Sequence, residues 1–180
     1  MEAYKTLRAY IKKEGIATQR KVLNREEFLK RAHSVDTNIY FIEKGSVRVF
    51  FVEDFEEHTF YFGYKESIIT ALDSFFSGKN SQLEIEALKK TEVSYLSKEE
   101  FLKFIFSRQE YQELWYKVLE EIIVHQAERE KDLLISSPVK RYQRVLKRRP
   151  ELFQEIPNKY IASYLRMSPE TLSRVKKTLI

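Results

Sequence analysis

The chain has 180 residues, of which 43% are hydrophobic and 33% are charged, as is typical of soluble globular proteins. It has no cysteine, which excludes disulfides, thiolate-bound zinc and iron–sulfur clusters, and its three histidines lie in unrelated segments, so no metal site is expected. No run of eighteen apolar residues and no apolar signal core are found, so a cytoplasmic protein without a membrane partner is expected.

The first part of the chain, residues 1–108, is expected to be an antiparallel β-roll with a helix in front of it. An apolar stripe at helical spacing indicates that helix and consists of Leu7, Tyr10 and Ile11. From residue 17 to residue 96, hydrophobic and polar residues alternate in short runs separated by turn-forming segments, which is typical of a small roll or jelly roll. A capping box at residues 97–100 then predicts a short helix.

Residues 109–135 are expected to form one long helix that joins two subunits. The segment has no Gly or Pro and carries two adjacent apolar stripes. The first stripe comprises Trp115, Val118 and Ile122, and the second comprises Leu119, Ile123 and Ala127. Two stripes require two partners, which predicts the β-roll on one side and the same helix of a second subunit on the other, with the first stripe assigned to the dimer interface. The alternative is a helix buried on two sides within one chain.

The last segment, residues 136–180, predicts a helix-turn-helix of the winged-helix type. A Ser-Ser-Pro sequence at 136–138 ends the long helix and marks a hinge. Asn158 can cap a first helix, and Ser168 with Pro169 can begin a second. Because only three residues lie between these helices, they are expected to cross steeply, which lets the second helix enter a major groove of double-stranded DNA.

The second helix is expected to read bases with its polar face. Glu170, Ser173, Arg174 and Lys177 share that face, while Leu172, Val175 and Leu179 point the other way. An arginine can bind guanine with two hydrogen bonds, a glutamate can accept from a cytosine amino group, and serine or lysine can hold a flanking base or phosphate. The predicted DNA-binding set also includes Ser168 and Lys159. The alternative is that this face is only the solvated side of a helical cap.

Positive charge is concentrated in the same segment. Residues 136–180 contain eleven Lys and Arg against three Asp and Glu, a net charge of +8, whereas the whole chain carries +5. Residues 1–135 therefore carry about −3 by difference. Such a distribution is expected if the last segment alone must neutralise DNA phosphates.

A β-roll, a long helix and a C-terminal helix-turn-helix, in this order, resemble the cyclic-AMP receptor and fumarate–nitrate regulator (Crp–Fnr) superfamily of bacterial transcription factors. Residues 39–49 resemble its strand-glycine-strand hairpin, and residues 168–174, Ser-Pro-Glu-Thr-Leu-Ser-Arg, resemble its recognition helix. The resemblance implies a homodimeric, sequence-specific regulator with a cyclic-nucleotide-binding-like domain, in which Glu170, Ser173 and Arg174 read bases. RNA polymerase is a further candidate partner.

One stretch departs from the family pattern. Members that bind a cyclic nucleotide hold its ribose with a Gly-Glu pair and its phosphate with an Arg-Ser or Arg-Thr pair, but Thr70-Ala71 and Ser81-Gln82 stand here. Without the guanidinium, cyclic AMP is not expected to bind, and no cofactor is identified. An unknown small-molecule effector can still occupy a pocket, although aromatic residues at this spacing also suit a plain core. The candidate pocket residues are Phe60, Phe62, Phe75, Phe76, Lys79 and Ser81.

The leading interpretation is a homodimeric DNA-binding transcription regulator with an effector-sensing β-roll. The alternative is a ligand- or protein-binding β-roll module whose helical tail contacts a protein partner. An enzyme is not expected, because the sequence has no His–acid pair with a nucleophile, no glycine-rich phosphate loop and only four glycines. The effector, the operator sequence and the choice between activation and repression stay open.

Overall fold

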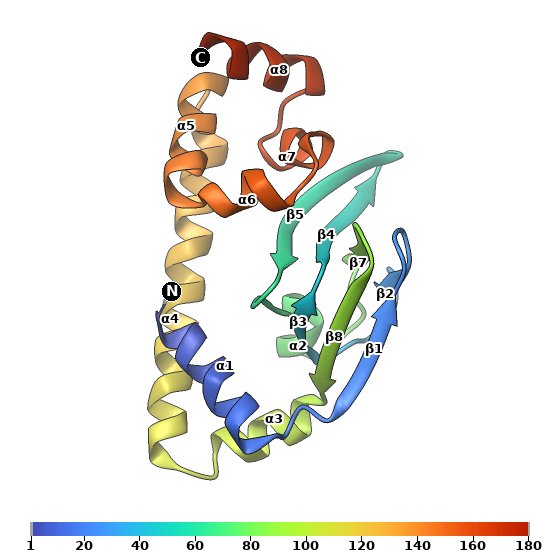
Figure 1. Ribbon diagram of the computed structural model, residues 1–180, viewed down its shortest axis with the longest axis vertical. Helices are drawn as coiled ribbons and strands as arrows, with labels where there is room; N and C mark the ends of the chain where they lie inside the picture. The colour runs from blue at the N-terminus through green and yellow to red at the C-terminus, as the bar shows by residue number, and fades with distance from the viewer. Residues whose placement is uncertain (1, 180) are drawn as a thin grey trace.

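The protein is an α+β molecule, as the sequence predicts. The computed structural model describes residues 2–179, so the outermost bounds expected for the first and last segments, residues 1 and 180, lie outside it. Two packed β-sheets lie beside one long helix (Figure 1). The helix that precedes the sheets and the one that follows them lie near the first half of the long helix, the C-terminal helices lie near its other end, and one short helix lies beside the strands.

The described part of the chain forms eight strands in two antiparallel sheets, and the hydrophobic core lies between the sheets. The strands are β1 (Gln19–Leu23), β2 (Phe28–Lys30), β3 (Ile39–Lys44), β4 (Ser46–Glu53), β5 (Glu56–Tyr64), β6 (Ile68–Ile69), β7 (Glu84–Ala87) and β8 (Thr91–Leu96). One sheet has the order β1-β8-β3-β6 and the other β2-β7-β4-β5. Both sheets contribute to the shared core, for example through Ile42 and Val93 from the first and Val49 and Ile85 from the second.

The turn at Gly45 joins the two sheets. Strands β3 and β4 flank it as expected, but β3 pairs with β6 and β8 while β4 pairs with β5 and β7, so the segment is a corner and the expected hairpin is wrong. Gly45 has φ +92°, and a Cβ there would lie 2.4 Å from Thr91 Oγ1. A side chain at this position would therefore clash with the start of β8.

Eight helices complete the described residues. They are α1 (Glu2–Glu14), α2 (Leu72–Ser77), α3 (Lys98–Ile105), α4 (Gln109–Leu134), α5 (Pro138–Arg148), α6 (Pro150–Glu155), α7 (Asn158–Tyr164) and α8 (Pro169–Thr178). The predicted capping box forms, since Ser97 Oγ accepts from the Glu100 amide and the Glu100 carboxylate accepts from the Ser97 amide. The predicted wing is wrong for the described residues: after β8 the regular elements are helices, and the short connections between α5 and α8 leave no room for a β-hairpin.

Helix α1 lies along the first half of α4, and side-chain contacts fix its first turn and its middle (Figure 1). The carboxylate of Glu121, on α4, accepts hydrogen bonds from the first amides of α1, at 2.9 Å from Glu2 N and 3.1 Å from Ala3 N. A carboxylate suits this place because the amides at a helix start are unpaired and carry a partial positive charge. Further along α1, the buried guanidinium of Arg8 pairs with Glu43 and Glu66 at the end of the first sheet.

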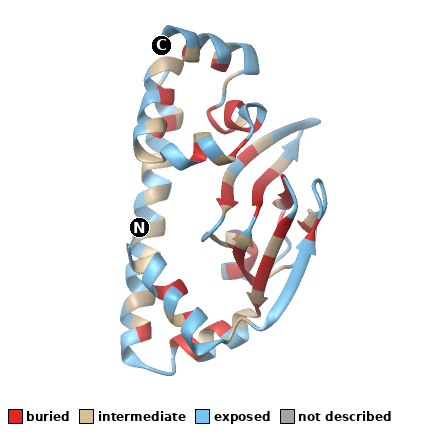
Figure 2. Cartoon of the chain, viewed as in Figure 1, coloured by how far each residue is buried: buried red, intermediate tan, exposed pale blue. Residues whose placement is uncertain are grey.

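The first apolar stripe of α4 is internal, which corrects the assignment of Trp115, Val118 and Ile122 to a dimer interface. Val118 is 2% exposed in the core shared with α1 and α3, and Trp115 stacks edge-on against Phe101 at 5.0 Å between ring centres. Side chains used in this way are unavailable to a second subunit. In the second predicted stripe Ile123 is 67% exposed and Ala127 is exposed, whereas Leu119 is half-buried. Tyr116 and Leu134, at 61% and 78% exposed, extend this stripe at both ends. Figure 2 shows exposed segments along α4.

The C-terminal helices fold back onto β5. Phe62 and Leu88 of the β-roll belong to the same buried cluster as residues of α5, α6, α7 and α8, and the rings of Phe62 and Tyr164 lie 5.5 Å apart. The buried Arg48 on β4 pairs with Glu57 and Glu86 and lies 4.5 Å from the centre of the Tyr160 ring on α7. Helices α5–α8 are thus held against the β-roll as well as against α4.

Candidate nucleic-acid interface and adjoining cavity

Helices α7 and α8 form a tandem with the predicted short connection. Ser168 Oγ accepts from the Thr171 amide at 3.2 Å, and Pro169 is the first residue of α8, as expected. The expected cap at Asn158 is wrong, because α7 already begins there after Pro157. The Asn158 side chain instead accepts a hydrogen bond from Lys176 Nζ at 2.6 Å, which joins the start of α7 to α8.

The two faces of α8 differ as the sequence predicts. Leu172 and Val175 are 1% and 4% exposed and pack into the core with Ile161 and Ala162 of α7. Leu179, expected on the same face, is exposed because it follows the last residue of the helix. The opposite face is open to solvent at Glu170, Ser173, Arg174 and Lys177, and Ser168 and Lys159 are also exposed.

The groups on the open face are charged donors and acceptors. Hydrogen bonds from the Ser168 hydroxyl and from its own backbone amide, with the charge of Arg174, keep the pKa of the Glu170 carboxyl below its ordinary value. Arg174 makes a single intramolecular side-chain contact at 3.3 Å, to Thr171 Oγ1, among the described residues, which leaves most of its guanidinium donors free. A carboxylate and a guanidinium side by side can accept from cytosine and donate to guanine.

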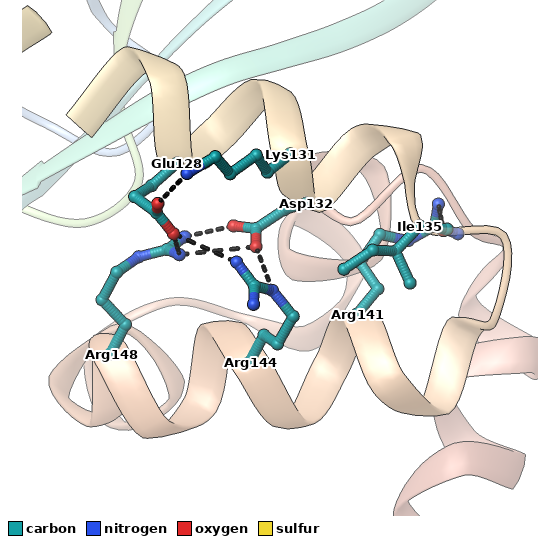
Figure 3. A network of polar contacts seen from close by, with 7 residues as sticks. All are labelled: Glu128, Lys131, Asp132, Ile135, Arg141, Arg144 and Arg148. Carbon is teal, nitrogen blue, oxygen red and sulfur yellow. Dashed lines mark hydrogen bonds and ion pairs between the residues drawn. The ribbon is translucent and has the colours of Figure 1, made fainter. Parts of the chain in front are cut away.

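Arg141 fixes the turn of the tandem to the end of α4, a contact that sequence reasoning missed. Its guanidinium donates to Ile135 O at 3.0 Å and to Arg166 O at 3.2 Å. Figure 3 shows Arg141 beside Ile135. The first acceptor follows α4, and the second lies in the α7–α8 connection. One buried side chain therefore sets the position of the tandem relative to the long helix.

Part of the positive charge of the last segment is used inside the protein. Arg144 and Arg148 on α5 point toward α4, where both pair with the fully buried carboxylate of Asp132 and with Glu128 (Figure 3). The net charge of +8 therefore overstates what a polyanion meets, because these two guanidinium groups already have acidic partners. The paired residues lie between twelve and twenty positions apart in sequence, and no pattern within either segment predicts these pairs.

A cavity of about 190 Å³ lies between the β-roll and α4. Phe60, Phe62, Phe75 and Phe76 line it, as expected for pocket residues. Lys79 and Ser81 do not line it. Gly78, with φ +69°, ends α2 and turns the chain away, and Ser81 is buried where its hydroxyl accepts from the Leu83 amide at 3.0 Å.

The cavity has a cationic wall that the sequence did not indicate. Arg129 of α4, Arg148 of α5 and Arg149 of the α5–α6 connection all line it, together with His125. Burial, reinforced by the charges of Arg149 and Arg148, lowers the pKa of His125 below its ordinary value. These residues lie some fifty or more positions from the aromatic ones, so only folding brings them together.

The fold of the described residues is similar to that of several solved structures. The sequence matches no protein-family model, and a search among curated proteins finds no relative. In solved structures, the chain resembles FixK2 from Bradyrhizobium japonicum with a TM-score of 0.73 at 18% identity, over 89% of this chain and 83% of FixK2.

Two other solved structures have a similar fold. A CooA variant from Carboxydothermus hydrogenoformans has a TM-score of 0.73 at 14% identity, over 91% of this chain and 78% of CooA. The c-di-GMP-responsive global regulator CLP of Xanthomonas campestris has a TM-score of 0.69 at 14% identity, over 95% of this chain and 91% of CLP. At these identities the likeness establishes the fold, and it confirms the resemblance at that level. Residues 2–179 contain no helix long and apolar enough to cross a membrane.

Proposed function

We propose that this protein is a sequence-specific DNA-binding transcription regulator. The observation that carries the proposal is the exposed face of α8, where Glu170, Ser173, Arg174 and Lys177 are free while the opposite face is packed. The excess of positive charge in residues 136–180 and the Crp–Fnr fold support it. In this proposal Arg174 and Glu170 read bases, and Ser173, Lys177, Ser168 and Lys159 hold flanking bases or phosphates.

The regulator is proposed to act as a homodimer. The partner helix would pack on the exposed stripe of α4, whose apolar members are Tyr116, Ile123, Ala127 and Leu134. These positions recur along one helix face, which suits pairing with a second copy about a two-fold axis. A two-fold dimer would present two α8 helices to two half-sites of double-stranded DNA.

In this proposal the chain has three parts. Residues 1–108 form the effector-sensing domain, 109–135 the dimerisation helix, and 136–180 the DNA-binding domain. The protein acts in the cytoplasm, has no enzymatic activity of its own, and has RNA polymerase as a candidate partner when bound to DNA.

The proposal is tested by selecting a binding site from random duplexes and then titrating two variants. Arg174→Ala should reduce the free energy of binding to the selected site by about 1–3 kcal/mol and that of binding to scrambled DNA only slightly, because a base contact is lost. Lys140→Ala removes an exposed charge at the start of α5. This variant should bind both duplexes more weakly to the same extent, and the slope of log K against log salt concentration should be smaller by about one.

Two outcomes would contradict the proposal. Equal losses on both duplexes for Arg174→Ala would mean that α8 does not read bases. If the selection enriches no common sequence, and if DNA affinity is weak and does not change with salt concentration, the alternative in which the helical tail contacts a protein is favoured.

A further inference from the structure

The cavity beside α4 has an apolar body and a cationic end, and this combination defines a ligand class. We propose that it binds a small organic anion: a carboxylate carried by a single ring or a short hydrocarbon chain. Thr70, Phe75 and Phe76 of the segment that departs from the cyclic-nucleotide pattern line this cavity, but Lys79 and Ser81 do not, so its positive charge comes from other elements.

The body of the cavity is apolar. Ile68, Phe75, Trp115 and Ile122 are among its lining residues, and they come from β6, α2 and α4. A volume of about 190 Å³ equals that of about six waters at roughly 30 Å³ each, which suits one ring or a short chain. Few polar groups in this part of the wall could satisfy water or a sugar, so a hydrocarbon body is favoured.

The cationic end lacks an anion. No Asp or Glu lines the cavity in residues 2–179, and of its three arginines Arg148 alone has acidic partners there, Asp132 and Glu128. Arg129 donates through Nη2 to Tyr164 O and stacks at 3.7 Å from the centre of that ring, but its buried Nη1 has no hydrogen-bond partner in this part of the chain. Burial lowers the pKa of Arg129; the charges of Arg141 and Arg148 act in the same direction, and that of Asp132 opposes them.

An unpaired buried guanidinium nitrogen is costly, and a carboxylate is the group that pairs with it best. Arg149 lines the same cavity, where it contacts the side chains of Tyr64 and Tyr164 but no Asp or Glu of the described residues. A bound carboxylate would neutralise Arg129 and Arg149 together. Because Arg129 lies on α4 and Arg149 between α5 and α6, the anion would join the long helix, the C-terminal helices and, through its body, the β-roll.

Calorimetric titration of the wild-type chain with four probes tests the ligand class. Octanoate, octanol, octylamine and acetate separate the charge of the head from the apolar body. Octanoate should bind about tenfold or more tightly than octanol, because a charge-assisted hydrogen bond is worth at least that factor. Octylamine and acetate should not bind measurably. Equal binding of octanol and octanoate would overturn the proposal, as would binding of cyclic AMP without binding of octanoate.

Variants then locate the head group. Arg129→Gln and Arg149→Gln should each lower the affinity for octanoate about tenfold and leave the weak affinity for octanol unchanged. Lys147→Gln is the matched control, since Lys147 is exposed and next to Arg148 but does not line the cavity. Circular dichroism checks that each variant is folded. An equal loss in the Lys147 variant would mean that general charge, not the cavity, attracts the anion.

A regulatory role of this site rests on the proposed function, and a separate measurement addresses it. Saturating octanoate should change the affinity of the wild-type chain for its selected duplex and leave the affinity of Arg129→Gln unchanged. If the chain binds no DNA, the proposed function fails while the calorimetric result stands. If octanoate binds but leaves DNA affinity unchanged, the site stands and its coupling to DNA is refuted.

Discussion

The Ser163 hydroxyl on α7 lies 3.1 Å from the backbone amide of Thr59 on β5, from which it accepts a hydrogen bond, and it donates to Glu57 O at 3.1 Å. One side chain of the helix tandem therefore satisfies two backbone groups of a β-strand more than one hundred residues earlier. Together with the contact of Arg48 with Tyr160, this pair fixes the proposed DNA-binding helices to the β-roll.

Ser163→Ala should loosen this contact without unfolding the chain. The substitution leaves two backbone groups without their partner, at a cost of about 1 kcal/mol since both can reach water once the contact opens. Hydrogen exchange should become faster in residues 57–61 and 158–164 and stay unchanged in β7 and β8. Unchanged exchange in both segments would mean that Phe62 and Tyr164 alone hold the two parts together. Ser173→Ala, on the open face of α8, is the control and should change neither segment.

Charged substitutions on the two stripes of α4 should have different effects. Ile123→Glu places like charges at the proposed two-fold contact and should give folded monomers in sedimentation experiments. Val118→Glu buries a carboxylate in the core of one chain and should lower the free energy of unfolding by about 3 kcal/mol or more. A dimer that survives Ile123→Glu with its helix content intact would disprove the proposed interface.

Asp132→Asn should destabilise the junction of α4 and α5. The buried carboxylate pairs with Arg144 and Arg148, and its removal leaves two guanidinium groups with Glu128 alone. The expected loss is about 2–4 kcal/mol in the free energy of unfolding, measured by urea titration. Glu130→Gln is the control because Glu130 is exposed on the same helix. A loss below about 0.5 kcal/mol for Asp132→Asn would mean that the ion pairs of Asp132 contribute little to stability, because solvent solvates the two arginines equally well.

His125 should make stability depend on pH in one direction. Its pKa in the folded chain is below the ordinary value of 6.5, because of burial and the charges of Arg149 and Arg148. Below about pH 6.5 the unfolded chain binds a proton at His125 more readily than the folded chain does. The free energy of unfolding should therefore fall as the pH is lowered through that value. Unfolding by urea between about pH 8 and pH 5 measures this loss.

The matched variant is His125→Gln, which cannot take up that proton. It should show a smaller fall in stability on acidification than the wild-type chain. Parallel pH profiles for the two chains would assign the loss to other groups.

Much of the local structure could be predicted from the sequence. The capping box at Ser97 and the absence of breakers from residue 109 to residue 134 depend on neighbours in the chain, and the structure has α3 and α4 where these signals predict them. The same holds for α8, because Ser168, Pro169 and the spacing of Leu172 and Val175 fix its start and its inner face.

Tertiary structure alone decided which partner each surface meets. Both predicted stripes of α4 are apolar, and the first was assigned to the dimer interface, but α1 and α3 cover Val118 and leave Ile123 exposed. The sequence around Gly45 predicts the turn of a hairpin, but the flanking strands β3 and β4 belong to different sheets. Their pairing partners are strands that lie elsewhere in the chain, so the local sequence does not determine the pairing. Arg129 lines the same cavity as Phe60 and Phe75 for a similar reason: these contacts form only when the β-roll, α4 and α5 pack together, so the sequence within each segment does not predict them.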